Sequence, residues 1–120
     1  MNAKKILIIE DAKDLLLLYT RFLQNTDYEI ATASSAHQAL QYLEKNTPDL
    51  ILMDLTFPDM STMDFCEKFT ALSHLDQVKK ILISGRDDLK TWVDVFNAQE
   101  GLRKPVERAT MAKAVTTHLP

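Results

Sequence analysis

The chain has 120 residues, of which 46% are hydrophobic and 26% charged, with 14 basic and 17 acidic residues and a formal net charge of −3. This length suits one domain with one core, so we expect residues 1–120 to form a single domain. The acidic balance argues against direct nucleic-acid binding, which needs a basic surface, and no apolar stretch is long enough to predict a membrane span.

The first half of the chain alternates strand-like and helix-like patterns. Residues 5–9 (KILII) are an almost unbroken aliphatic run, typical of a strand covered on both faces. Apolar side chains spaced by three and four residues then predict a helix whose buried stripe is Leu15, Leu18, Tyr19, Phe22 and Leu23. Residues 28–33 (YEIATA) predict a weaker strand. A second helix is predicted with the buried stripe Ala36, Ala39, Leu40 and Leu43.

The second half repeats this alternation. Residues 50–53 (LILM) and 81–83 (ILI) predict two more buried strands. Between them, Ser61 followed three residues later by Asp64 is typical of a capping box that opens a helix. A fourth helix is predicted from the stripe Leu89, Trp92, Val93 and Phe96. Residues 101–103 predict a short strand, and a final helix carries Met111, Ala114 and Val115.

This order of five strand–helix units indicates an α/β fold. Each pair of parallel strands needs a crossover connection, so the helices must cover both faces of a doubly wound, five-stranded parallel sheet. In such sheets the ligand site lies beyond the carboxyl ends of the strands. The residues that follow each strand are therefore the candidates for function.

Charged and hydroxyl side chains follow four of these strands. Glu10 and Asp11 follow the first strand, Asp54 the third, Ser84 the fourth and Lys104 the fifth. Three carboxylates at one edge repel one another unless a cation neutralises part of their charge. Oxygen ligands without nearby histidine or cysteine favour a hard ion, and Mg²⁺ takes only one or two protein carboxylates. The sequence thus predicts a site for Mg²⁺ and an incoming phosphate.

The same residues give the chain a resemblance to a known family over essentially its whole length. Glu10-Asp11, Asp54 with Pro58 four residues later, Ser84-Gly85 and Lys104-Pro105 resemble the motifs of receiver domains of two-component response regulators, the CheY-like superfamily. The resemblance implies a flavodoxin-like strand order, 2-1-3-4-5. It also implies that Asp54 takes a phosphoryl group from a sensor histidine kinase or a histidine phosphotransfer protein. In this family the Lys-Pro bond can be cis.

The resemblance assigns the metal ligands. Asp11, Asp54 and the backbone carbonyl of Thr56 are expected to hold Mg²⁺, with Glu10 as a ligand directly or through water. A carboxylate is a competent phosphoryl acceptor, because the transfer depends more on positioning and charge neutralisation than on a strong base.

The resemblance also assigns the groups that meet the phosphoryl oxygens. Lys104 is expected to pair with them and Ser84 to donate its hydroxyl, while Gly85 leaves room for that approach. Thr56 and Arg86, two residues beyond Asp54 and Ser84, are expected to flank the mouth of the site. We expect Arg86 to contact or shield the phosphoryl group and to slow its loss.

Two positions depart from the family pattern. Gly101 stands three residues before the lysine, where receivers commonly carry a tyrosine or phenylalanine whose ring moves on activation. One hypothesis is that Trp92 replaces that ring as the reporter of phosphorylation. The other is that activation couples only weakly to the surface formed by the fourth helix, the fifth strand and the fifth helix. Thr62 stands where the family usually has a glycine in the loop after the acceptor, which leaves the conformation of that loop open.

Two alternative functions remain at this stage. A haloacid-dehalogenase type phosphatase also uses an aspartate at a strand end, but it needs a second acid two residues later, where this chain has Thr56. A phosphate-independent, receiver-like interaction module is the other alternative. Gly101 is the reason to consider it, whereas the intact set of acids, serine and lysine argues against it. Under the main hypothesis the protein is not an enzyme that turns over an external substrate.

Other residues suggest ordinary roles. Cys66 is the only cysteine, which excludes an internal disulfide and agrees with a cytoplasmic protein. We expect Cys66 to be a small helix residue, and His37, His74 and His118 to be surface or hydrogen-bonded residues. The downstream target is open, and the chain is either a stand-alone receiver or a fragment of a larger regulator or hybrid kinase.

Overall fold

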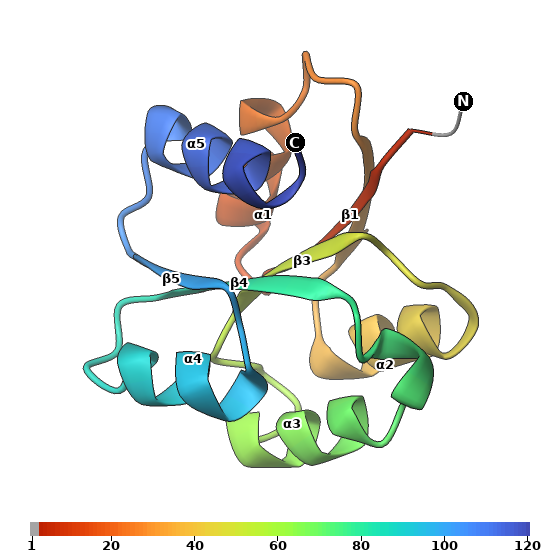
Figure 1. The fold of residues 1–120 in the computed structure, drawn as a ribbon. Helices are drawn as coiled ribbons and strands as arrows, with labels where there is room; N and C mark the ends of the chain where they lie inside the picture. Colours follow the sequence, from red (N-terminus) through yellow and green to blue (C-terminus); the bar gives the residue numbers. More distant parts are fainter. Residues whose placement is uncertain (1–2) are drawn as a thin grey trace.

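The computed structural model describes residues 3–120 (Figure 1). One parallel sheet has the strand order β2-β1-β3-β4-β5. Its strands are β1 (Lys5–Ile9), β2 (Glu29–Ala33), β3 (Leu50–Asp54), β4 (Lys79–Ser84) and β5 (Glu100–Arg103). The predicted α/β fold and the strand order implied by the family resemblance are both confirmed.

Helices cover both faces of this sheet, as Figure 1 shows. One face carries α1 (Lys13–Phe22) and α5 (Arg108–His118). The other carries α2 (Ala36–Lys45), α3 (Thr62–Thr70) and α4 (Leu89–Phe96), and a short 3-10 helix (Ser73–Leu75) precedes β4. None of the helices within residues 3–120 combines the length and the hydrophobicity that a membrane crossing requires.

The sheet separates two apolar cores, which explains the unbroken aliphatic strands. Every residue of β3 is buried, because its successive side chains point alternately into one core and the other. Leu52 packs beneath α1 and α5 with Tyr19, whereas Met53 packs against α3 and α4 with Phe65. The central strands are thereby fixed in register at both faces.

The strand register brings the carboxyl ends to one level. Ile9 of β1 pairs with Met53 of β3, and Asp54 pairs with Ile83 of β4. Ser84, the last residue of β4, pairs with Arg103, which directly precedes Lys104. The residues predicted to act together therefore leave the sheet at the same edge.

The end of α5 is tied to the opposite edge of the sheet. The Nζ atom of Lys79, at the start of β4, donates to the carbonyl of His118 at 2.6 Å. The hydroxyl of Tyr28, just before β2, donates to the carbonyl of Leu119 at 3.1 Å. These two bonds hold the carboxyl-terminal turn beside the amino ends of the strands.

One predicted stripe needs correction. Leu18 was expected on the buried side of the first helix, but it is 41% exposed, whereas Leu16 is half-buried. Leu16 packs against the core that contains Tyr19 and Met111, whereas Leu18 lies beside Pro105 at the rim of that face. Thr62 also lies in the first turn of α3, not in the preceding loop, and Ser61 caps that helix by accepting from the amide of Asp64.

Candidate functional site

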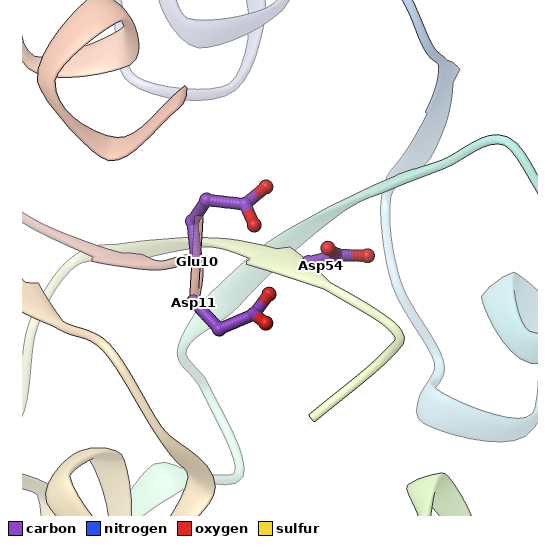
Figure 2. A group of neighbouring side chains, drawn as sticks. All are labelled: Glu10, Asp11 and Asp54. Carbon is purple, nitrogen blue, oxygen red and sulfur yellow. The ribbon is translucent and has the colours of Figure 1, made fainter. Parts of the chain in front are cut away.

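Three carboxylates gather where β1 and β3 end. Oxygen atoms of Glu10, Asp11 and Asp54 all lie within 4.8 Å of one another. Figure 2 shows the side chains of Glu10 and Asp11 leaving the end of β1 on the side where Asp54 lies. Glu10 and Asp54 are buried, whereas Asp11 is exposed. This set of oxygen donors, with one member open to solvent, fits a hard divalent cation.

Lys104 places a cation against the same cluster. Its Nζ atom lies 3.0 Å from Oδ2 of Asp54 and 3.1 Å from Oε1 of Glu10. The peptide bond between Lys104 and Pro105 is cis, as the family resemblance allowed. Burial is the strongest effect on Lys104 and would lower its pKa, but the hydrogen bonds and charges of Asp54 and Glu10 together raise that pKa. The ammonium group therefore stays charged at neutral pH.

Glu10 is the most buried member of the cluster. Burial, and then the charge of Asp54, raise the pKa of its carboxyl, while the amide of Ala12 and the ammonium of Lys104 act in the opposite direction. Its Oε2 atom accepts from that amide at 3.1 Å, just before α1 begins. Glu10 thus joins the start of α1 to the acid cluster.

The loops after β3 and β4 supply further groups. The amide of Thr56 donates to Oδ1 of Asp54 at 3.3 Å, and Thr56 is exposed. The Oγ atom of Ser84 accepts from the amide of Arg86 at 3.0 Å. A Cβ built at Gly85 would lie 4.0 Å from Cβ of Lys104, which is ordinary contact. The predicted residues are thus brought together, although Ser84 is bonded here to Arg86.

The side chain of Arg86 is held between two loops. Its Nε and Nη2 atoms donate to the two oxygens of Asp88 at 3.0 and 2.8 Å, and Nη1 donates to Oγ1 of Thr62 at 3.1 Å. Thr62 in turn donates its hydroxyl to the carbonyl of Leu55. Asp88 also accepts from Nε1 of Trp92 at 3.0 Å. The sequence singles out Thr62, Arg86 and Trp92 separately but gives no signal for Asp88, which joins them.

The packing of α4 explains the absence of a ring at Gly101. A Cβ built there would lie 2.8 Å from Cγ2 of Val93 and 3.1 Å from Cγ of Leu89, closer than side chains tolerate. The helix therefore rests directly on the backbone of β5. A tyrosine or phenylalanine at position 101 would require α4 to move away.

The remaining candidates have ordinary environments. His37 pairs with Asp59, His74 bonds the carbonyl of Leu43, and His118 pairs with Glu100. Cys66 is buried in α3, and burial raises the pKa of its thiol, so it is not an activated nucleophile.

The fold and this site define a class of protein. The sequence model described as the response regulator receiver domain matches residues 6–116, and the chain belongs to that family. The chain is 25% identical to sporulation initiation phosphotransferase F of Bacillus subtilis, over 100% of this chain and 97% of that protein.

Solved structures of receivers have the same fold. A CheY-like response regulator receiver domain protein from Methanospirillum hungatei superposes with a TM-score of 0.85 at 26% identity, covering 98% of this chain and 94% of that one. For the chemotaxis response regulator CheY4 of Vibrio cholerae the TM-score is 0.88 at 22% identity, with 98% and 99% covered. The chain spans only 27%, 50% and 25% of the length of PhoP, VanRc and LuxO, three longer regulatory relatives.

Proposed function

We propose that Asp54 accepts a phosphoryl group in a two-component phosphorelay and that residues 1–120 act as one receiver domain. The observation that carries this proposal is the placement of Asp54 between a lysine and two other carboxylates at the carboxyl edge of the sheet. The alternative phosphatase has no comparable support, because position 56 is Thr56 and not a second acid.

The chemistry follows from the residue types. An oxygen of Asp54 forms a bond to phosphorus while the bond from phosphorus to the donor's imidazole nitrogen breaks, and the imidazole leaves with that electron pair. Lys104 is already within 3.0 Å of Asp54 and neutralises charge on the acceptor and then on the phosphoryl oxygens. Ser84 donates its hydroxyl to one of those oxygens, which Gly85 leaves accessible.

Metal binding completes the proposed site. Asp11, Asp54 and the backbone carbonyl of Thr56 would hold Mg²⁺, with Glu10 as a direct or water-mediated ligand. Bound Mg²⁺ would neutralise the carboxylates and the phosphoryl oxygens. Repulsion within the acid cluster supports this assignment, because one lysine offsets only part of the charge of three carboxylates.

The partner is proposed to be a sensor histidine kinase or a histidine phosphotransfer protein. An apolar hollow of about 320 Å³ lies beside Lys104, and its lining residues are Leu15, Leu18, Tyr19, Lys104, Pro105 and Val106. The exposed side chain of Leu18 borders this hollow, so it is free to contact a protein that brings a phosphohistidine to Asp54. The downstream target is a second protein whose identity the sequence does not specify.

The proposed role is that of a switch, not of an enzyme acting on an external substrate. The domain assists its own phosphorylation and dephosphorylation, and Thr56 and Arg86 tune how long the phosphoryl group persists. The single, buried cysteine supports a cytoplasmic location.

Intact mass after incubation with Mg²⁺ and acetyl phosphate tests this function. The wild type should gain one phosphoryl group, and Asp54→Asn, which keeps the shape of the side chain, should gain none. Asp59→Asn is a suitable control, because Asp59 follows the same strand but pairs with His37. If the folded wild type gains no mass, the phosphate-independent interaction module becomes the better description of the protein. The close packing of α4 on Gly101, which leaves no room for an aromatic ring, would agree with that outcome.

A further inference from the structure

A line of four side chains runs from the residue after Asp54 to the middle of α4. It consists of Thr62, Arg86, Asp88 and Trp92. Thr62 is bonded to the carbonyl of Leu55, so Arg86 lies two hydrogen bonds away from the residue that follows the acceptor. The amide of Arg86 is bonded to Ser84, so both ends of this residue are attached to the site.

We propose that Arg86 exchanges the carboxylate of Asp88 for the phosphoryl group on Asp54, and that this exchange changes the environment of Trp92. The proposal rests on the phosphorylation of Asp54 proposed above. It makes Thr62 and Asp88 positioning residues, which hold the guanidinium near the site before the phosphate arrives. It also supplies a route from the phosphorylated site to α4 in a chain that has Gly101 where receivers commonly carry a mobile aromatic ring.

The exchange is favourable because the two partners of Arg86 differ in charge and exposure. The side chains of Arg86 and Asp88 are 38% and 44% exposed, so solvent screens their bidentate ion pair. A phosphoryl group carries about two negative charges, and its oxygens bind a guanidinium in a bidentate manner. When Ser84 donates its hydroxyl to the phosphoryl group, its oxygen can still accept from the amide of Arg86. The backbone at Arg86 therefore moves together with Ser84.

Asp88 has a second position available when Arg86 leaves. Asp88 is the N-cap residue of α4. Among the residues that the structure describes, its carboxylate accepts hydrogen bonds from Arg86 and Trp92 and none from the amides of the first turn of the helix. An aspartate at this position normally accepts from those amides. Release of Arg86 frees the carboxylate to cap α4, and the indole of Trp92 then loses its hydrogen-bond acceptor.

Trp92 makes the exchange measurable, because it is the only tryptophan in the chain. The wild type, Arg86→Lys and Asp88→Ala would each be incubated with Mg²⁺ and acetyl phosphate. Intact mass, tryptophan emission and acrylamide quenching would then be measured on the same samples. Arg103→Lys is the matched control, since Arg103 contacts the same segment through the carbonyl of Arg86.

The wild type and the control should show an emission change and stronger quenching in proportion to the phosphorylated fraction. Asp88→Ala should show strong quenching without phosphate and no further change. Arg86→Lys should gain the phosphoryl group without the emission change and should lose it about threefold to tenfold faster, as expected when the cation is kept but the equivalent of one ordinary hydrogen bond is lost.

Each opposite result has a distinct meaning. A mass gain in the wild type with unchanged emission and quenching would overturn the exchange and leave the proposed function standing. A full emission change in Arg86→Lys would do the same. An absent mass gain in the folded wild type would overturn the proposed function and the exchange with it.

Discussion

The ammonium of Lys104 lies 3.0 Å from the carboxylate of Asp54 and also contacts Glu10, which is 2% exposed. One cation thus offsets two buried carboxylates. Lys104 therefore neutralises part of the negative charge of the resting site. A bound metal ion would share these two carboxylates with Lys104, and a phosphoryl group on Asp54 would share the ammonium of Lys104 with Glu10.

Replacing this lysine should therefore destabilise the protein. Lys104→Met leaves Glu10 and Asp54 without a cation, and we expect a loss of about 1–3 kcal/mol in the free energy of unfolding at pH 7 in EDTA. Mg²⁺ should restore much of it. Urea denaturation with and without Mg²⁺ measures both effects. Lys90→Met, at an exposed position of α4, should change stability by less than about 0.5 kcal/mol. Equal stability of Lys104→Met and the wild type would contradict the charge balance described here.

Asp11 should contribute to the stability of the protein only when Mg²⁺ is bound. It is exposed, so Asp11→Asn should change the stability of the metal-free protein by less than about 0.5 kcal/mol. The proposed ligand set predicts that the variant needs at least about tenfold more Mg²⁺ for the same rise in melting temperature. Thermal unfolding across a Mg²⁺ titration checks this, with Asp14→Asn as an exposed control on α1. The ligand assignment fails if the two variants behave alike.

Replacement by alanine should destabilise the protein at one of its two glycines and not at the other. Gly101→Ala forces a Cβ against Val93 and Leu89 and should cost about 1–3 kcal/mol. Gly85→Ala meets only ordinary contact and should be neutral or stabilising by up to about 1 kcal/mol. Adding Val93→Ala to Gly101→Ala should relieve part of the loss, so a double-mutant cycle by urea denaturation should be non-additive. Strict additivity would mean that the clash is not with Val93.

Asp59 should stabilise the start of α2 in a pH-dependent way. Its carboxylate accepts from the amides of Ala36 and His37. Burial acts to raise its pKa, but these bonds and the side chain of His37 prevail and lower that pKa from 3.8 to about 2.

Because the pKa is lower in the folded chain, the stabilisation is complete above pH 3.8 and is lost as the pH falls towards 2. Asp59→Ala should cost about 1 kcal/mol at pH 7, as for other lost helix caps, and the difference from the wild type should shrink across this window. Denaturation curves at pH 7, 4 and 3 test it. His37→Ala keeps both amide bonds and should cost less, and a difference independent of pH would exclude the capping role.

The sequence predicted the strands well because aliphatic runs leave few other possibilities. Residues 5–9 were predicted with the observed bounds, since a strand covered on both faces must be apolar throughout. The fourth strand was predicted too short, because the prediction used only the aliphatic run 81–83, whereas the strand begins at Lys79. Lys80 is nevertheless buried, with its ammonium bonded to the carbonyl of Val78 and placed over the ring of Phe69.

The site was predictable only where it follows strand ends. Glu10, Asp54 and Lys104 could be grouped from the sequence because parallel strands end at one edge. The bonds from Arg86 to Thr62 and Asp88 depend on how two loops approach each other, which no spacing in the sequence encodes. Asp88 itself resembles an ordinary N-cap residue until the structure reveals its partners.

The bonds that hold His118 and Leu119 at the amino ends of the strands have a practical consequence. A peptide tag joined after Pro120 would leave the molecule beside the amino ends of the strands, whereas Asp54 lies at the carboxyl end of β3. A protein immobilised through such a tag would present Glu10, Asp54 and Lys104 to the solution. Surface-based binding measurements with candidate kinases can therefore use this end of the chain as the point of attachment.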